Sequence, residues 1–242
     1  MVRAAALAGL AVSLAAMAPG AAGAECRLAL LLGLDISSSV DADEDALQRG
    51  GMAAALRAPE VQAAFFAADQ TVALAVFEWS GRYNQEVLLD WTMINSPTDL
   101  DRVAGVIGQT RRSYAEFPTA MGEALSFAAG MMDRAPSCLM RTIDMAGDGE
   151  NNEGAGPDAA YTLPSFQTIT VNGLVVANAA DFQTEERLTA YYRDHVLHGP
   201  GAFMVVADGF DDYLRAMRQK LEREVRPPTI GALPAPQPER AG

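Results

Sequence analysis

Oxygen-bearing side chains gather in two short segments of the chain, and each segment follows an apolar run. Asp35, Ser37 and Ser39 alternate directly after the first run. Asp148 lies in a second polar segment, residues 147–152. Carboxylate and hydroxyl oxygens are hard donors, which suit Mg²⁺, Ca²⁺ or Mn²⁺ better than zinc or copper. If the carboxylates act only through water, a bound cation stays electron-poor and would attract a carboxylate from outside the chain.

The elements that would position these residues alternate between strand and helix. Asp41, with Glu44 three residues later, predicts a capped helix start. The connection 80–84 is short enough for a hairpin, which makes the third strand antiparallel. Further helices are predicted at 99–107, 119–132, 185–197 and from Asp208 onward. Apolar runs predict strands at 28–34, 71–79, 85–91, 139–146, 168–176 and 203–206.

This alternation predicts an α/β fold, with a doubly wound, mostly parallel six-stranded sheet and helices on both faces. In such sheets, binding sites form beyond the carboxyl ends of the strands. Both polar segments follow predicted strands, so we expect Asp35 and Asp148 at the same rim. The alternative for the first segment is a serine-rich approach to a helix, with Asp35 as its cap.

The first 24 residues have the features of a secretory signal peptide. A basic start at Arg3 precedes an apolar run at 4–17 and an A-x-A site, which predicts cleavage after Ala24. The run is shorter than the ~20 residues that span a bilayer. We expect an exported protein, periplasmic or secreted, with no membrane span. The predicted organisation is a signal peptide (1–24), one domain (25–226) and a disordered proline-rich tail (227–242).

Charge and cysteine content narrow the function further. The chain has 31 acidic and 18 basic residues, a net charge of −13, which argues against nucleic-acid and anionic-lipid partners. Lys220 is the only lysine, which excludes most lysine-centred chemistry. Cys26 and Cys138 are the only cysteines, and an oxidising compartment favours a disulfide between them. Two free buried thiols are the alternative.

The pattern Asp35-x-Ser37-x-Ser39, followed by Thr119 and then Asp148-Gly149, resembles the metal-ion-dependent adhesion site (MIDAS) of von Willebrand factor A domains. The resemblance covers the chain from the predicted cleavage site to about residue 226. The stretches 78–81, 144–149, 191–195 and 199–203 are similar to those of a bacterial family of exported proteins of unknown function built on that domain.

The resemblance implies a sheet order of 3-2-1-4-5-6 with a metal at its top. It implies direct bonds from Ser37, Ser39 and Thr119, with Asp35 and Asp148 acting directly or through water. Mg²⁺ is the first choice, with Ca²⁺ and Mn²⁺ as alternatives.

Two positions depart from the pattern of A domains. Gly147 precedes Asp148 where these domains usually have Thr or Ser. Phe117-Pro118 precede Thr119 where the common pattern has Gly. For Thr119, a second interpretation is that it only caps its helix.

The implied sheet order also bears on the cysteines. It makes the first and fourth strands neighbours, with Cys26 and Cys138 at similar depth at the bottom of the sheet. Neighbouring strands lie ~4.8 Å apart, within reach of a disulfide. The resemblance therefore favours the bridge.

The resemblance implies a protein that works by binding rather than by catalysis. Its cation would complete its shell with an Asp or Glu of a protein partner. The alternative is a metal-dependent, phosphatase-like hydrolase in which the same cation activates water. A haloacid-dehalogenase-type phosphatase is disfavoured, because Ser37 stands where that chemistry needs a second Asp. A third hypothesis is a scaffold with an empty site. No sequence pattern indicates an oligomeric state.

Overall fold

The central feature of the fold is a six-stranded sheet in the order β3-β2-β1-β4-β5-β6. The computed structural model describes residues 26–177 and 182–227, so the predicted signal peptide and most of the predicted tail lie outside the described residues. β3 is antiparallel to β2, and the other neighbouring pairs are parallel. The predicted fold class and strand order are confirmed. The strands are β1 (Cys26–Asp35), β2 (Val72–Trp79), β3 (Gln85–Ile94), β4 (Cys138–Gly147), β5 (Thr170–Ala177) and β6 (Met204–Asp208).

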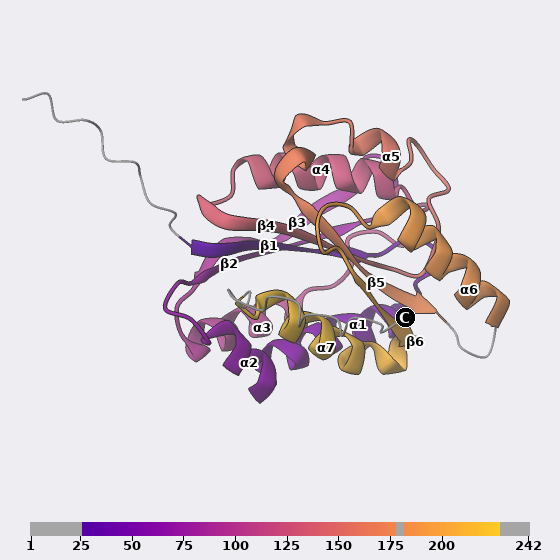
Figure 1. Ribbon diagram of the computed structural model, residues 1–242. Helices are drawn as coiled ribbons and strands as arrows, with labels where there is room; N and C mark the ends of the chain where they lie inside the picture. The colour runs from indigo at the N-terminus through magenta and orange to yellow at the C-terminus, as the bar shows by residue number, and fades with distance from the viewer. Residues whose placement is uncertain (1–25, 178–181, 228–242) are drawn as a thin grey trace, which may run out of the picture.

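Helices cover both faces of the sheet (Figure 1). One face carries α1 (Ala42–Arg57), α2 (Pro59–Phe65), α3 (Pro97–Gln109) and α7 (Tyr213–Val225). The other carries α4 (Met121–Asp133), α5 (Pro157–Ala160) and α6 (Phe182–Tyr191). Every residue of β1 is buried, because its alternating side chains enter the two cores in turn: Leu30 and Leu32 face α1 and α7, and Leu31 faces α4.

The boundaries of α6 and α7 differ from the predictions, and some short elements were not predicted. The capping box at the start of α1 is confirmed, since Asp41 accepts from the Glu44 N–H and Glu44 accepts from the Asp41 N–H. α6 gives way to a π-helical turn, η2 (Tyr192–Val196). α7 begins at Tyr213 after a short 3₁₀ turn, η3 (Phe210–Asp212), because Gly209 has a positive φ of 72° and interrupts the predicted start at residue 208. α2, α5 and the 3₁₀ turn η1 (Pro164–Thr168) were not predicted.

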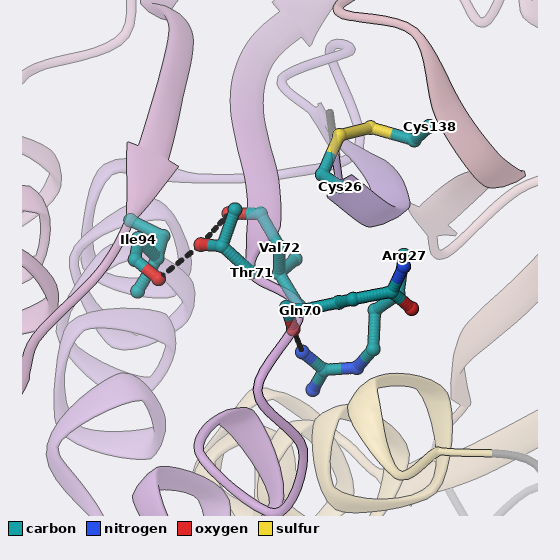
Figure 2. The surroundings of a disulfide bond; sticks show 7 residues. All are labelled: Cys26, Arg27, Gln70, Thr71, Val72, Ile94 and Cys138. Atoms are coloured by element: carbon teal, nitrogen blue, oxygen red, sulfur yellow. Dashed lines mark hydrogen bonds between the residues drawn. A yellow bond between two sulfur atoms is a disulfide. The ribbon is translucent and has the colours of Figure 1, made fainter. Parts of the chain in front are cut away.

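The expected disulfide joins the lower ends of β1 and β4. Cys26 and Cys138 are register partners in the parallel pair and are bonded to each other (Figure 2). The alternative of two free thiols is therefore wrong. The bridge closes a loop with a sequence separation of 112 residues, and it lies at the end of β1 opposite to Asp35.

A buried arginine fixes two helix ends beside the disulfide (Figure 2). The Arg27 guanidinium donates to the carbonyl of Phe65 at the end of α2 and to that of Val225 at the end of α7. It also donates to the carbonyl of Gln70, just before β2. Carbonyls at helix C-termini lack partners within their own helix, so a cation there satisfies them. Burial lowers the pKa of Arg27. No described helix is long and apolar enough to cross a membrane.

Candidate metal site at the carboxyl rim of the sheet

The five predicted site residues lie together at the carboxyl rim. β1 ends at Asp35 and its neighbour β4 ends one residue before Asp148, so the loops that follow these strands lie side by side. Ser39 Oγ donates to Asp148 Oδ1 at 2.7 Å. Ser37 Oγ lies 3.1 Å from Ser39 Oγ and accepts from Thr119 Oγ1 at 3.2 Å. Three hydroxyls and one carboxylate thus form a continuous hydrogen-bonded row.

Asp35 lies behind this row, in the sheet. Its side chain is buried, and Oδ1 accepts from the Ser37 N–H at 2.7 Å. Its Oδ2 is also buried and has no hydrogen-bond partner. Burial, and then the negative charge of Asp148, raise the pKa of Asp35 to about 8. One oxygen of this carboxylate is therefore removed from water without a hydrogen bond in return.

Asp148 is partly exposed at the outer side of the row. Burial raises the pKa of Asp148, against the lowering effect of the hydrogen bond from Ser39, and the charge of Glu44 raises it further. In the described part of the chain, no lysine or arginine acts on the pKa of Asp148 or of Asp35. The rim therefore holds two carboxylates without a cation supplied by the described residues.

The loop before α4 positions Thr119. The Thr119 N–H donates to Asn152 Oδ1 at 2.8 Å, and its carbonyl accepts from the Asn152 N–H at 2.9 Å. The Ser38 N–H donates to the Phe117 carbonyl, which ties this loop to the one after β1. The N-cap of α4 is Ala120, which makes no side-chain cap bond, so the interpretation of Thr119 as a helix cap is wrong. Its hydroxyl instead faces Ser37.

A buried ion network supports the same loop from below. Glu78, near the end of β2, accepts from the Ser113 N–H with one oxygen and from Arg49 of α1 with the other, at 2.9 and 2.5 Å. Arg49 also pairs with Asp45 one turn earlier in α1. No role was predicted for these residues, although a charged Glu78 within an otherwise apolar run indicates that a partner must lie nearby.

Gly147 leaves room that a side chain would fill. A Cβ at this position would lie 2.9 Å from Asp35 Oδ2 and 2.8 Å from the Tyr192 hydroxyl. Both distances are too short for a carbon atom, so a residue larger than glycine would displace one of the two groups. This explains in physical terms why glycine stands where A domains usually have Thr or Ser.

The donor set fits a hard divalent cation. It comprises two carboxylates and three hydroxyls, all oxygen ligands. No group of three or more His, Cys, Asp or Glu side chains able to hold a metal occurs among the residues described. A cation at the rim would therefore depend on hydroxyl ligands as well as on carboxylates, which lowers the negative charge around it.

This sheet order, with helices on both faces, is a von Willebrand factor A-like fold. The chain belongs to the family described as "Protein of unknown function (DUF1194)", which matches residues 25–229. None of the curated proteins matches the chain.

Solved structures share the fold at low sequence identity. Proximal thread matrix protein 1 from the mussel byssus, with a zinc-occupied MIDAS motif, is 15% identical with a TM-score of 0.56, covering 83% of this chain and 46% of its own. A von Willebrand factor type A protein from Catenulispora acidiphila is 13% identical with a TM-score of 0.53, and the match covers 83% of this chain and 43% of that protein. An aerotolerance-related membrane protein from Bacteroides fragilis, with multiple mutations to serine, is 16% identical with a TM-score of 0.53. The match covers 81% of this chain and 99% of that protein. The chain thus spans less than half the length of the first two.

Proposed function

We propose that the rim cluster binds one divalent cation, with Mg²⁺ the first choice and Ca²⁺ or Mn²⁺ as alternatives. Ser37, Ser39 and Thr119 would supply hydroxyl ligands, and Asp35 and Asp148 would act directly or through water. The observation that carries the proposal is the buried, unpartnered Oδ2 of Asp35. A buried carboxylate without a counter-charge is unfavourable by several kcal/mol, and a cation at the rim would offset that cost.

We propose further that the bound cation recruits an acidic group from a protein partner. Neutral hydroxyls supply more than half of the ligands, so the cation would keep part of its positive charge. In the row, Ser39 is exposed and Asp148 is partly exposed, so the open side of the cation would face solvent. An Asp or Glu of the partner fits that position, because a carboxylate is a strong ligand for a hard cation. The mussel protein, which shares the fold, has a zinc-occupied MIDAS motif, and this supports a divalent cation at the rim.

We propose that the protein acts outside the cytoplasm, in the periplasm or after secretion. The features of residues 1–24 support export, and the disulfide between Cys26 and Cys138 is compatible with an oxidising compartment.

Calorimetric titration of the purified protein with MgCl₂, CaCl₂ and MnCl₂ tests the metal proposal. We expect one site per chain, lost in Asp35→Ala and in Asp148→Ala. Asp69→Ala is the matched control, because it removes the same charge from an exposed turn at the opposite end of the sheet. Equal binding by wild type and Asp35→Ala would refute the site. Unchanged melting with and without each metal would favour the empty scaffold.

A peptide array tests the partner proposal. Peptides that contain a single Glu are compared with the same peptides carrying Gln, in Mg²⁺ and in EDTA. We expect retention only of Glu peptides and only with the metal, because the carboxylate is the ligand. Retention that is insensitive to EDTA would contradict the proposal. Turnover of generic phosphate or ester substrates that disappears with EDTA would instead support the hydrolase.

A further inference from the structure

A buried tyrosine fills a slot between two glycines of neighbouring strands. Tyr192, the first residue of the π turn η2, is fully buried against β4 and β5. A Cβ at Gly173 of β5 would lie 2.6 Å from the Tyr192 ring, and a Cβ at Gly147 of β4 would lie 2.8 Å from its hydroxyl. Neither position can carry a side chain while the ring stays in place. The two glycines therefore admit the ring and bring its hydroxyl to the rim.

The hydroxyl of Tyr192 and the free oxygen of Asp35 border the same space beside Gly147. The hydroxyl and Asp35 Oδ2 both lie within 3 Å of one point, the position of a Cβ on Gly147. Both atoms are buried and neither has a hydrogen-bond partner. A buried polar atom left unpaired is costly, and here two such atoms, a donor and an acceptor, border the same space without bonding to each other. A tyrosine hydroxyl carries its proton at neutral pH, since its ordinary pKa is about 10, and it can therefore donate a hydrogen bond.

The backbone around Tyr192 is tied to the same rim. The preceding residue, Tyr191, accepts with its hydroxyl from the Asn151 N–H at 3.2 Å, in the loop after β4. The α-helix ends at Tyr191, and the wider π turn begins at Tyr192. π turns are rare and often accompany functional sites. Two adjacent tyrosines therefore reach the metal-site loop and the buried carboxylate behind it.

We propose that Tyr192 is a positioning residue of the cation site, acting through Asp35. In the metal-bound protein its hydroxyl donates a hydrogen bond to Oδ2 of Asp35, which fixes the orientation of that carboxylate toward the cation and its waters. Tyr192 itself is not a ligand. This inference rests on the proposed metal site, and it adds a residue that lies 157 positions away from Asp35 in the sequence.

The test compares Tyr192→Phe with Tyr213→Phe. Tyr213 is equally buried and also has an unpartnered hydroxyl, but it belongs to the core on the α7 face. Groups that orient metal ligands typically contribute 10- to 100-fold to metal affinity. We expect Tyr192→Phe to raise the Kd for Mg²⁺ by about 10- to 100-fold and Tyr213→Phe to leave it unchanged. The melting temperature of metal-free Tyr192→Phe should stay close to that of wild type, because the ring still fills its slot.

The outcomes separate this inference from the metal site itself. If Asp35→Ala abolishes Mg²⁺ binding and Tyr192→Phe binds as wild type does, the role of Tyr192 is refuted and the site stands. If Asp35→Ala binds Mg²⁺ normally, both are refuted. A lower melting temperature with an unchanged Kd would assign Tyr192 a purely structural role.

A spectroscopic measurement covers the case in which Tyr192→Phe does not fold. Mg²⁺ is titrated into Tyr213→Phe while the near-ultraviolet absorption of tyrosine is recorded. A new hydrogen bond donated by a phenol shifts that absorption to longer wavelength. We expect a shift that saturates with the metal. An unchanged tyrosine spectrum at saturating Mg²⁺ would refute the inference.

Discussion

Two clusters of buried acidic groups in this protein differ in how their charge is balanced. The rim cluster contains Asp35 and Asp148, surrounded by hydroxyls. The second cluster, called here the lower cluster, lies between the sheet and α7 and contains Asp144 and Glu224, with Lys220 between them. Asp144 is in the strand that leads to the rim, four residues before Asp148. The two clusters therefore share a strand and an excess of negative charge.

The lower cluster carries its own cation. Lys220 Nζ lies 2.9 Å from Asp144 Oδ1, as an ion pair without hydrogen-bond alignment, and 2.5 Å from Glu224 Oε1. Asn172 donates to the same oxygen of Glu224 at 2.8 Å. Burial, and then the charge of Glu224, raise the pKa of Asp144 to about 7, against the lowering effect of Lys220. The only lysine of the chain is thus fully buried in a structural role.

The two clusters differ in the kind of cation that can balance their charge. Lys220 reaches its cluster from within the chain, so that cluster is complete as soon as the protein folds. The rim has three hydroxyls where the lower cluster has an ammonium, and one of its carboxylates keeps an unpartnered buried oxygen. The comparison predicts a permanent structural charge at the lower cluster and an exchangeable one at the rim.

The largest expected effect comes from the disulfide, which serves as a reference for both clusters. Replacing Cys26 and Cys138 by alanine should lower the free energy of unfolding by about 4 to 5 kcal/mol, because the bridge restricts a very long loop in the unfolded chain. The bridge lies at the edge opposite to the rim, so the Kd for Mg²⁺ should not change. Urea unfolding and calorimetry measure the two quantities. A weaker Kd in the variant would show that the rim is not independent of the lower edge.

The variant Lys220→Met tests whether the charge of Lys220 stabilises the folded protein through Asp144 and Glu224. We expect the free energy of unfolding to fall by about 3 to 5 kcal/mol, because the substitution leaves Asp144 and Glu224 buried without a counter-charge. The triple variant Lys220→Met, Asp144→Asn and Glu224→Gln is the control, and it should recover part of the loss by removing the unpaired charges. Urea unfolding at neutral pH measures each variant. Wild-type stability in Lys220→Met would contradict the comparison.

Sequence patterns predicted the fold well because each strand carries its own signal. β1 and β2 are buried on both faces and appear as unbroken apolar runs, and the connection to β3 is short enough to require a hairpin. The end of α6 and the start of α7 were predicted wrongly. The first depends on a π turn whose tyrosine packs against two distant glycines, and the second on the positive φ of Gly209. Both are tertiary effects with no local pattern.

The same distinction applies to the rim. The residues that sequence reasoning brought together are those with a regular spacing, such as Asp35, Ser37 and Ser39. The residues it missed come from distant parts of the sequence: Asn152 hydrogen-bonds the backbone of Thr119, and Tyr192, which we propose positions Asp35, comes after β5. Such residues belong to no sequence motif, since any segment that the fold brings next to the rim can supply them.

Adding Mg²⁺ tests whether the rim takes up an exchangeable cation. At a concentration of 100 times Kd, the metal should raise the free energy of unfolding of wild type by about 2.7 kcal/mol, because it binds the folded state alone. Lys220→Met should gain the same increment from its lower starting point, and Asp35→Asn should gain little. Urea unfolding with Mg²⁺ and with EDTA measures the increments. An increment that is smaller in Lys220→Met would show that the clusters are coupled through β4.

The smallest expected effect, counted per pH unit, is in the pH dependence of stability, and it distinguishes the clusters most directly. In the folded protein, the pKa of Asp144 is raised to about 7, above its ordinary value of about 3.9. The raised pKa favours folding below the ordinary value, and this contribution is lost as the pH rises through about 7. The slope is at most about 1.4 kcal/mol per pH unit. Asp144→Asn should lack this slope, with or without Mg²⁺, because an asparagine side chain does not ionise.

The rim should show a different response, since the pKa of Asp35 is raised to about 8 in the metal-free protein. Without metal, Asp35 adds a second loss of stability between about pH 4 and pH 8. A bound cation favours the ionised carboxylate and so should remove that loss, while the loss from Asp144 remains. Urea unfolding of wild type, Asp144→Asn and Asp35→Asn between pH 5 and 8 resolves the two, each in Mg²⁺ and in EDTA. If Mg²⁺ left the wild-type profile unchanged, the rim would be as closed to outside cations as the lower cluster.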